Sequence, residues 1–287
     1  MIRQQTGRFI DAHVHLKDGE GLETIVSAGI AAVRNAGMNV KPGETAAERG
    51  STFVGEPVVL SSCWALFKQG GYGARFGVPV RYPQQIADEI ARLKNAGAGI
   101  IKVMASGMVS LKKPGTVTEG GFDGEELRFI VQEAARHGLG VMAHANGEPA
   151  ISAAAAAGVR SVEHGFFMTE SALELLRQQG TFWTPTVGAL VRAADAAGAP
   201  NETKRFVCRL VEEHLQMLQR AWSLGVPLAV GTDCVLPDPR YSEAYEAELA
   251  FFEQAGIPSE AVTRIATEGG ARLLGLPSSE WGVRSSE

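Results

Sequence analysis

The amino-acid sequence predicts an α/β protein of the (β/α)8 class, in which eight parallel strands close into a TIM barrel. Short apolar or β-branched runs alternate with helical patterns from one end of the chain to the other. Several helical patterns close with a glycine shortly before the next apolar run. Eight strands alternating with about eight helices in roughly 250 residues are what a closed barrel requires, and an open doubly wound sheet is the alternative.

Eight runs share the strand pattern, and each is followed by loop residues and a helix candidate. They are FIDAHVHL (9–16), IAAVRNAG (30–37), PVVLSSCW (57–64), GIIKVMAS (99–106), GVMAHAN (140–146), SVEHG (161–165), FWTPTV (182–187) and LAVGTDC (228–234). In a barrel the loops that follow the strands surround the active-site face, so polar residues at the ends of these runs are the candidates for chemistry.

Helices are predicted most clearly over 84–97, 123–138 and 201–224, where apolar residues recur at three- and four-residue steps. The glycines that close helical patterns are Gly97, Gly138, Gly158 and Gly225. Two long glycine-rich segments, 65–83 and 107–122, follow the third and fourth strands. They are expected to be loops that cover the active-site face and determine specificity.

Composition indicates an ordinary soluble globular protein of 287 residues, with one domain as the simpler expectation. A net charge of −5 without a basic run, together with 7% aromatic residues, gives little support to a nucleic-acid surface. No segment is long and apolar enough for a membrane span or a signal peptide. We therefore expect a cytoplasmic protein that acts on a small-molecule substrate, with association into a homo-oligomer left open.

Two histidines of the first strand point to a metal site. Strand side chains alternate between faces, so His13 and His15 project from the same side of the strand. A single strand histidine is usually a hydrogen-bonded core residue. For an HxH pair at the carboxyl end of a strand, preceded by Asp11, binding a metal ion and packing in the core are equally consistent with the sequence.

Lys102 interrupts the apolar fourth strand, where an unpaired ammonium would cost several kcal/mol. Either a carboxylate pairs with this ammonium, which the spacing alone favours, or the amine stays neutral and reacts with carbon dioxide. The resulting carbamate would present two oxygens that can bridge cations.

Three further polar residues end predicted strands: His144 in VMAHANG, His164 in VEHG and Asp233 in AVGTDC. A barrel places the end of the eighth strand beside the first, and therefore places Asp233 beside the histidine pair. Polar residues at the ends of five different strands are hard to explain as independent core accidents. We therefore expect these side chains to converge.

The remaining histidines and the three cysteines are expected to serve packing or solubility. The cysteines show no CxxC spacing, so Cys63 and Cys208 are predicted to be buried thiols. Cys234 follows a predicted ligand and either packs in the core or lines the site. His137 and His214 lie within or at the end of helical patterns and are predicted to be solvated.

Taken together, these segments resemble the amidohydrolase superfamily, particularly its imidazolonepropionase-like and Xaa-Pro dipeptidase-like members with two-metal centres. The resemblance covers nearly all of residues 9–276. It includes, in family order, DAHVHL, AVRNAG, IIKVMASG, VMAHANG, SVEHG, PT, GTD and a terminal ARLLGL.

The resemblance implies two divalent metal ions, with zinc the expected element. It implies that His13, His15 and Asp233 hold one ion and that His144 and His164 hold the other. An N-carboxylated Lys102 would bridge the two ions together with a hydroxide.

The reaction implied is hydrolysis of an amide or cyclic amide C–N bond, with peptides included as substrates. Asp233 would carry a proton from the attacking hydroxide to the leaving nitrogen. An ester, lactone or phosphotriester hydrolase and a non-catalytic binding barrel are the alternatives.

The chain also departs from its relatives. Many of them carry a β-sandwich formed by both termini, which is expected here to be absent or truncated, leaving one barrel domain over 1–276 and a tail over 277–287. Asn35 stands where an aspartate is common, and Tyr72 in GGYG stands where a histidine is common. Six residues within or next to the two long loops are expected to contact the substrate, and the cationic ones could bind a substrate carboxylate. They are Trp64, Lys68, Tyr72, Arg75, Lys112 and Lys113.

Overall fold

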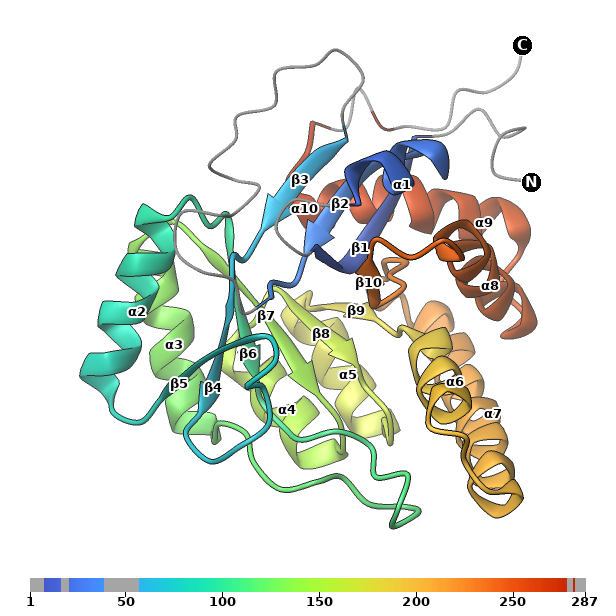
Figure 1. Cartoon of the computed structure of the whole chain (residues 1–287), viewed down its shortest axis with the longest axis horizontal. Coiled ribbons are helices and arrows are strands. Elements are labelled where there is room, and N and C mark those ends of the chain that lie inside the picture. The colour runs from blue at the N-terminus through green and yellow to red at the C-terminus, as the bar shows by residue number, and fades with distance from the viewer. Residues whose placement is uncertain (1–7, 17–20, 39–56, 278–280, 282–287) are drawn as a thin grey trace.

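The fold consists of parallel strands surrounded by helices. The computed structural model describes residues 8–16, 21–38, 57–277 and 281 (Figure 1). The strands are β1 (Phe9–Leu16), β2 (Ile30–Asn35), β3 (Val58–Ser61), β4 (Ala65–Lys68), β5 (Gly77–Val80), β6 (Ile100–Met104), β7 (Gly140–Ala145), β8 (Ser161–His164), β9 (Phe182–Thr184) and β10 (Cys234–Leu236).

The strands pair in parallel in two sheets, with the orders β10-β1-β2-β3 and β5-β4-β6-β7-β8-β9. Further backbone hydrogen bonds join the sheets. The amide of Gly99 donates to the carbonyl of Ser61 at 2.9 Å, and the amide of Ala12 donates to that of Val230 at 2.8 Å. The amide of Trp183 donates to Pro227 at 2.8 Å. The ring of strands expected for a TIM barrel is therefore confirmed.

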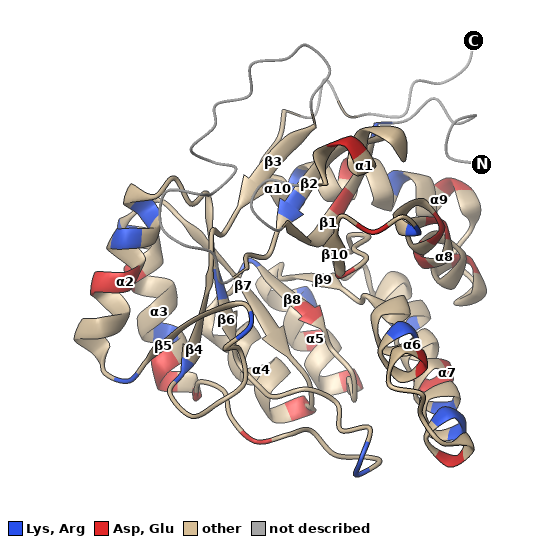
Figure 2. Ribbon diagram, viewed as in Figure 1, with Lys and Arg blue, Asp and Glu red and all other residues tan. Residues whose placement is uncertain are grey.

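The helices are α1 (Leu22–Ser27), α2 (Pro83–Asn95), α3 (Gly124–Arg136), α4 (Glu148–Ala157), α5 (Glu170–Gln179), α6 (Val187–Ala196), α7 (Asn201–Leu224), α8 (Tyr241–Gln254), α9 (Ser259–Arg264) and α10 (Gly270–Leu274), with a π-helical turn over Ile265–Gly269. Successive helices α2 to α5 pack side by side outside the strands (Figure 1). In the view of Figure 2, cations and anions are interspersed over the outer helices.

The three helices that the sequence predicted most clearly are confirmed to within two residues at each end. The side chain of Asp123 explains the start of α3: it accepts hydrogen bonds from the amides of Glu125 and Glu126, each at 3.0 Å. The carboxylate of Glu126 accepts in return from the amide of Asp123, which completes a capping box.

Two segments differ from the prediction. Residues 65–83 were expected to be a loop, but they contain β4, β5 and the first residue of α2. The residues 228–234 were expected to be a regular strand. Regular strand pairing begins only at Cys234. The backbone before it, over residues 228–233, forms isolated backbone contacts with β9 and β1 instead of a continuous ladder.

The amino-terminal end of the barrel is filled by apolar side chains. Ile10, Phe182 and Ala229 form a buried cluster with Trp281, which is 2% exposed. The guanidinium of Arg8 lies 4.5 Å from the Trp281 ring centroid. Residues 278–280 and 282–287 of the predicted tail lie outside the described residues, whereas Trp281 is part of this cluster.

Candidate metal centre

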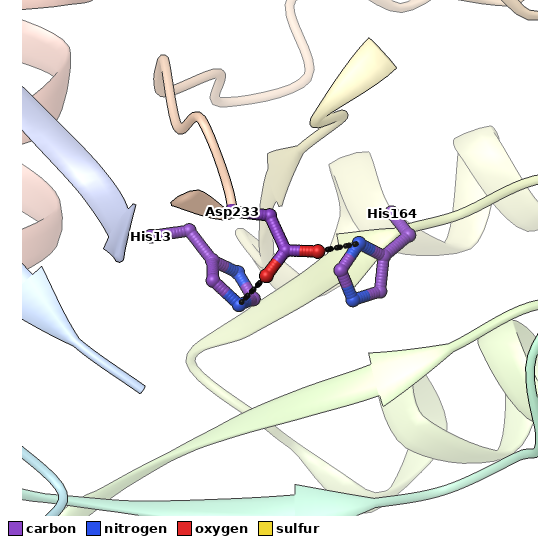
Figure 3. A group of neighbouring side chains, drawn as sticks. All are labelled: His13, His164 and Asp233. Atoms are coloured by element: carbon purple, nitrogen blue, oxygen red, sulfur yellow. Dashed lines mark ion pairs between the residues drawn. The ribbon is translucent and has the colours of Figure 1, made fainter. Parts of the chain in front are cut away.

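The polar residues singled out in the sequence meet at the carboxyl ends of the strands. His13 and His15 come from β1, His144 from β7 and His164 from β8, and Asp233 immediately precedes β10. One carboxylate oxygen of Asp233 lies 3.1 Å from His15 Nε2 and 3.4 Å from His13 Nε2. The other lies 4.0 Å from His164 Nδ1, so Asp233 stands between two of the imidazoles (Figure 3).

The four imidazoles form one cluster. The ring centroids of His13 and His164 are 5.1 Å apart, and those of His144 and His164 are 4.5 Å apart. Ligand atoms of His13, His164 and Asp233 all lie within 4.8 Å of one another. This is the convergence that the sequence predicted.

Each histidine has one ring nitrogen fixed by a neighbour. Nδ1 of His13 lies 2.8 Å from Glu163, Nδ1 of His15 2.5 Å from the Gly37 carbonyl, Nδ1 of His164 2.7 Å from Thr186 Oγ1, and Nε2 of His144 2.9 Å from the Gly107 carbonyl. The second nitrogen of each ring is left for another partner. Neighbours of this kind set the tautomer and orientation of metal-binding histidines.

His13 Nε2 is itself buried and has no hydrogen-bond partner among the described residues. Burial lowers the pKa of His13 to about 4, with the charge of Lys102 adding to the effect. The ring is therefore neutral near pH 7, which is the form that binds a cation.

Two strand ends adopt an uncommon backbone geometry. His164 and Asp233 have φ angles of 67° and 56°, in the left-handed region that side chains other than glycine rarely adopt. Thr186, which hydrogen-bonds His164, has a φ of 46°. Such conformations cost of order 1–3 kcal/mol each and are found where the surrounding structure holds a functional side chain in place.

Lys102 lies on β6, is 1% exposed, and its Nζ has no hydrogen-bond partner among the described residues. The ion pair that the spacing favoured is therefore not found in the described part of the chain. Burial lowers the pKa of Lys102 to about 8, although the charges of Glu163 and Asp233 oppose the shift. At pH 7 an amine with this pKa is neutral in about one molecule in ten, far more often than an ordinary lysine, and the neutral form can act as a nucleophile.

Sequence reasoning missed a buried ion pair directly behind the cluster. Arg34 Nη2 lies 2.8 and 2.9 Å from the two carboxylate oxygens of Glu163, and both side chains are fully buried. Burial raises the pKa of Glu163, but Arg34 and the hydrogen bond with His13 outweigh burial and lower it well below its usual value. The acidic residue directly before His164 in VEHG was the available signal, since a carboxylate in a buried strand needs a partner.

Asp11 links β1 to the segment that carries Asp233. Its carboxylate accepts hydrogen bonds from the Thr232 amide at 3.0 Å, the Thr232 hydroxyl at 2.7 Å and the Tyr241 hydroxyl at 3.0 Å. Asn35 likewise has a structural role, because its side-chain oxygen accepts from the amides of Leu16 and Gly37. Both residues therefore support the cluster rather than join it.

A cavity of about 460 Å³ opens onto the cluster and is lined by all six predicted ligands. Of the residues expected to contact substrate, Tyr72 and Lys112 line this cavity. Burial raises the pKa of the Tyr72 phenol above its ordinary value, so the hydroxyl remains a hydrogen-bond donor near pH 7.

The other four residues do not line the cavity. Trp64 is buried, and its indole N–H donates to Glu89 at 2.7 Å. Lys68 forms an ion pair with Glu126 at 2.9 Å. The guanidinium of Arg75 lies 5.8 Å from the Phe76 ring centroid, and Lys113 is exposed beside the cavity-lining Lys112.

Two packing predictions were wrong. His214 was expected to be solvated but is 2% exposed, because its position in α7 faces the barrel wall. Its ring stacks on Phe166 with centroids 4.3 Å apart and meets Trp183 edge-on at 5.1 Å. Cys208 was expected to be buried but is exposed on α7, whereas Cys63 is buried as predicted. Of the two alternatives for Cys234, packing is the one found, because it is buried and does not line the cavity.

The model of the amidohydrolase family matches residues 9–279. The chain belongs to the amidohydrolase family. The match includes every residue of the cluster. Among the described residues no helix combines the length and hydrophobicity needed to cross a bilayer.

Amidohydrolase relatives include ochratoxinase of Aspergillus niger, which is 32% identical over 238 residues, covering 74% of this chain and 48% of the relative. The chain thus spans about half the length of that curated relative. The crystal structure of A. niger ochratoxinase has a TM-score of 0.77 at 25% identity and covers 93% of this chain and 71% of the other. A Xaa-Pro dipeptidase with bound methionine has a TM-score of 0.78 at 22% identity, covering 96% and 77%, and supports the fold.

Proposed function

We propose that this amidohydrolase is a binuclear metal-dependent enzyme that hydrolyses an amide or cyclic amide C–N bond. The observation that carries the proposal is the convergence of four imidazoles, one carboxylate and a buried, unpartnered amine in the lining of one cavity. Its ochratoxinase relative supports amide hydrolysis as the reaction.

The residues of the cluster fit two metal ions. His13, His15 and Asp233 would hold one ion, and His144 and His164 the other, since each ring keeps one nitrogen that its fixed neighbour does not use. Imidazole and oxygen ligands suit zinc, with iron, manganese and cobalt compatible with the same set. Lys102, N-carboxylated, would supply an oxygen to each ion, which would give its orphaned Nζ a role.

When bound, the two ions would supply Lewis acidity for the substrate carbonyl and lower the pKa of an attacking water. Asp233 would accept the proton of that water on a carboxylate oxygen and deliver it to the leaving nitrogen. Burial raises the pKa of Asp233, but the neighbouring His13 and the hydrogen bond from His15 outweigh burial and lower this pKa well below its ordinary value. Asp233 is therefore a carboxylate near pH 7, which is the form that the proposed first step requires.

Two cavity residues outside the cluster would orient the substrate. The Tyr72 hydroxyl would donate a hydrogen bond to a polar group of the substrate, since Tyr72 lines the cavity and burial keeps its phenol protonated. Lys112 lines the cavity, and its ammonium would meet a substrate carboxylate. Lys113, its exposed neighbour, offers a matched comparison because it has the same charge and does not line the cavity.

Metal analysis combined with a substrate panel tests the proposal. Purified protein should hold about two divalent ions per chain, and chelation should abolish activity that added zinc restores. The panel should contain N-acyl amino acids, dipeptides and cyclic amides beside esters, lactones and phosphotriesters. Hydrolysis restricted to the last three classes would replace the amide assignment, and a protein that binds no metal would support a non-catalytic barrel.

A further inference from the structure

One wall of the cavity is largely apolar, with Ser110 as its polar member. From α6 it receives Ala189, Leu190 and Ala193, and from the loop after β6 it receives Val109 and Leu111. An antiparallel bridge between Val109 and Val117 gives this loop a hairpin-like form. The polar cluster and the apolar wall are different parts of one cavity, so the reaction and the binding of an apolar substrate group would take place in different parts of it.

Side chains behind this wall hold it in place. Leu190 is 7% exposed and belongs to a buried cluster with Val109, Phe166 and residues of α7 that include Phe206 and Leu210. The wall is therefore continuous with the protein core. Because cores are close-packed, its shape is fixed before a ligand arrives.

Helix α6 is also fastened at two points near the cluster. Glu248 of α8 accepts hydrogen bonds from the amides of Val187 at 2.6 Å and Gly188 at 2.9 Å, which caps the first turn of α6. Arg192 donates to the carbonyl of Thr232, the residue before Asp233. The helix that forms the apolar wall is thus attached to the strand end that carries the proton-transfer residue.

We propose that the wall formed by α6 and residues 109–111 is a subsite for a bulky apolar group, such as an aromatic ring, carried by the amide substrate. This inference rests on the proposed amide hydrolysis. Leu190 supplies the contact surface, and the small side chains of Ala189 and Ala193 leave the space that such a group occupies. With a substrate that lacks this group, water would fill this part of the cavity, and the favourable free energy of burying apolar surface would be lost.

The test compares four amides with the metal-loaded enzyme: N-acetyl-L-alanine, N-acetyl-L-phenylalanine, N-(2-naphthoyl)-L-alanine and N-(2-naphthoyl)-L-phenylalanine. We expect kcat/KM to be higher by about tenfold or more than for N-acetyl-L-alanine when the ring lies on the side of the amide that enters the subsite. Varying the two sides of the amide independently tells which side enters the subsite. Equal values for all four amides would overturn the inference while leaving amide hydrolysis in place.

Substitutions in α6 test the location of the subsite. Ala193→Phe fills the chamber and should reduce the ratio of kcat/KM for ring-bearing over N-acetyl-L-alanine substrates by about tenfold. Ala196→Phe is the control, because Ala196 is exposed on the same helix, as Ala193 is, but does not line the cavity. An unchanged ratio in Ala193→Phe, in protein whose melting temperature matches the wild type, would overturn the assignment to this wall.

A binding measurement separates this inference from the reaction. Calorimetric titration with 2-naphthamide needs no turnover, and its Kd should rise about tenfold in Ala193→Phe and stay unchanged in Ala196→Phe. If no amide is hydrolysed but this pattern is found, the subsite stands and the proposed function fails. If 2-naphthamide does not bind the wild-type protein, the subsite fails.

Discussion

The two ends of the barrel are built from the same strands, but one end is packed with apolar side chains and the other holds the polar cluster and its cavity. At the amino-terminal end, β1 and β9 contribute Ile10 and Phe182 to an apolar cluster that Trp281 completes. At the carboxyl end, β1 contributes two histidines to a cavity where polar atoms lack protein partners. The first end gains stability from apolar burial and leaves one buried polar atom, Trp281 Nε1, without a hydrogen bond among the described residues. The second end leaves two, His13 Nε2 and Lys102 Nζ, where the candidate ligands converge.

The polar cluster lowers the free energy of unfolding. A buried polar atom without a hydrogen bond costs about 1–3 kcal/mol, and the cluster holds two such atoms, Lys102 Nζ and His13 Nε2. Between the two ends lies the Arg34–Glu163 pair, which satisfies its own charges and orients His13. Changes at the cavity end should therefore affect metal and turnover, and changes at the closed end should affect stability alone.

Replacing Lys102 should have the largest effect. Lys102→Ala removes the proposed bridge, so metal content should fall well below that of the wild type and turnover should be lost. Short carboxylic acids, which can place an oxygen pair in the vacated space, should restore part of both. Metal analysis with and without propionate measures this, and Lys113→Ala is the control on an exposed lysine. Full metal content in Lys102→Ala would exclude the bridge.

Asp233→Asn should reduce kcat by about 10²- to 10⁴-fold, since the amide cannot carry the proton. Most of the metal should remain, because the imidazoles are untouched. Asp195→Asn, an exposed position on α6, should behave as the wild type. Turnover by the Asp233 variant at the wild-type rate would remove this residue as the proton carrier.

Glu163→Gln tests the layer between the two ends. It leaves the buried guanidinium of Arg34 without its carboxylate, and breaking a buried ion pair in this way costs about 3–5 kcal/mol of the free energy of unfolding. Urea denaturation measures the loss. Glu174→Gln, which removes a half-exposed surface carboxylate paired with Arg177, should cost less than about 1 kcal/mol and shift the urea midpoint only slightly. A Glu163 variant as stable as the wild type would show that this pair does not support the cluster.

Trp281→Ala tests the closed end. Truncating a buried tryptophan leaves a cavity and should cost about 3 kcal/mol of stability. Metal content and kcat should match the wild type at temperatures where the variant is folded. Trp222→Ala is the matched control, because Trp222 is 39% exposed on α7. A specific loss of metal in the Trp281 variant would contradict the separation of the two ends.

The sequence was sufficient for the parallel α/β fold and for the convergence of the candidate ligands, because strand alternation and strand ends are local patterns. It could not locate the eighth strand, whose backbone bonds through isolated contacts rather than a regular ladder. It also missed the partners of the site residues. Arg34 and Glu163 lie 129 residues apart, and only the closed barrel brings them together.

The same limit explains His214, since helical periodicity alone did not show which packing surface its ring would meet. The stack on Phe166 and the edge contact with Trp183 place this ring in the wall behind the cavity. Nε2 lies 3.3 Å from the carbonyl of Pro185, the residue before Thr186. His214 is therefore a buried neutral group between the outer helices and the cavity end.

The pH dependence of stability tests this placement. Burial lowers the pKa of His214 to about 4 from its ordinary 6.5. Between pH 6.5 and pH 4 the His214 ring is protonated in the unfolded chain but stays neutral in the folded protein. The free energy of unfolding therefore falls as pH decreases through this interval. Between pH 7 and pH 5 this group alone should remove about 2 kcal/mol.

His214→Phe keeps the aromatic contacts and cannot be protonated, so its unfolding free energy should decline less than that of the wild type over the same interval. His137→Phe is the matched control, because that ring is partly exposed at the end of α3 rather than buried against the barrel wall. Urea denaturation at pH 7 and pH 5 measures both. A His214 variant with the wild-type slope would show that this ring takes up its proton in the folded state, and would place it in contact with water rather than in the wall.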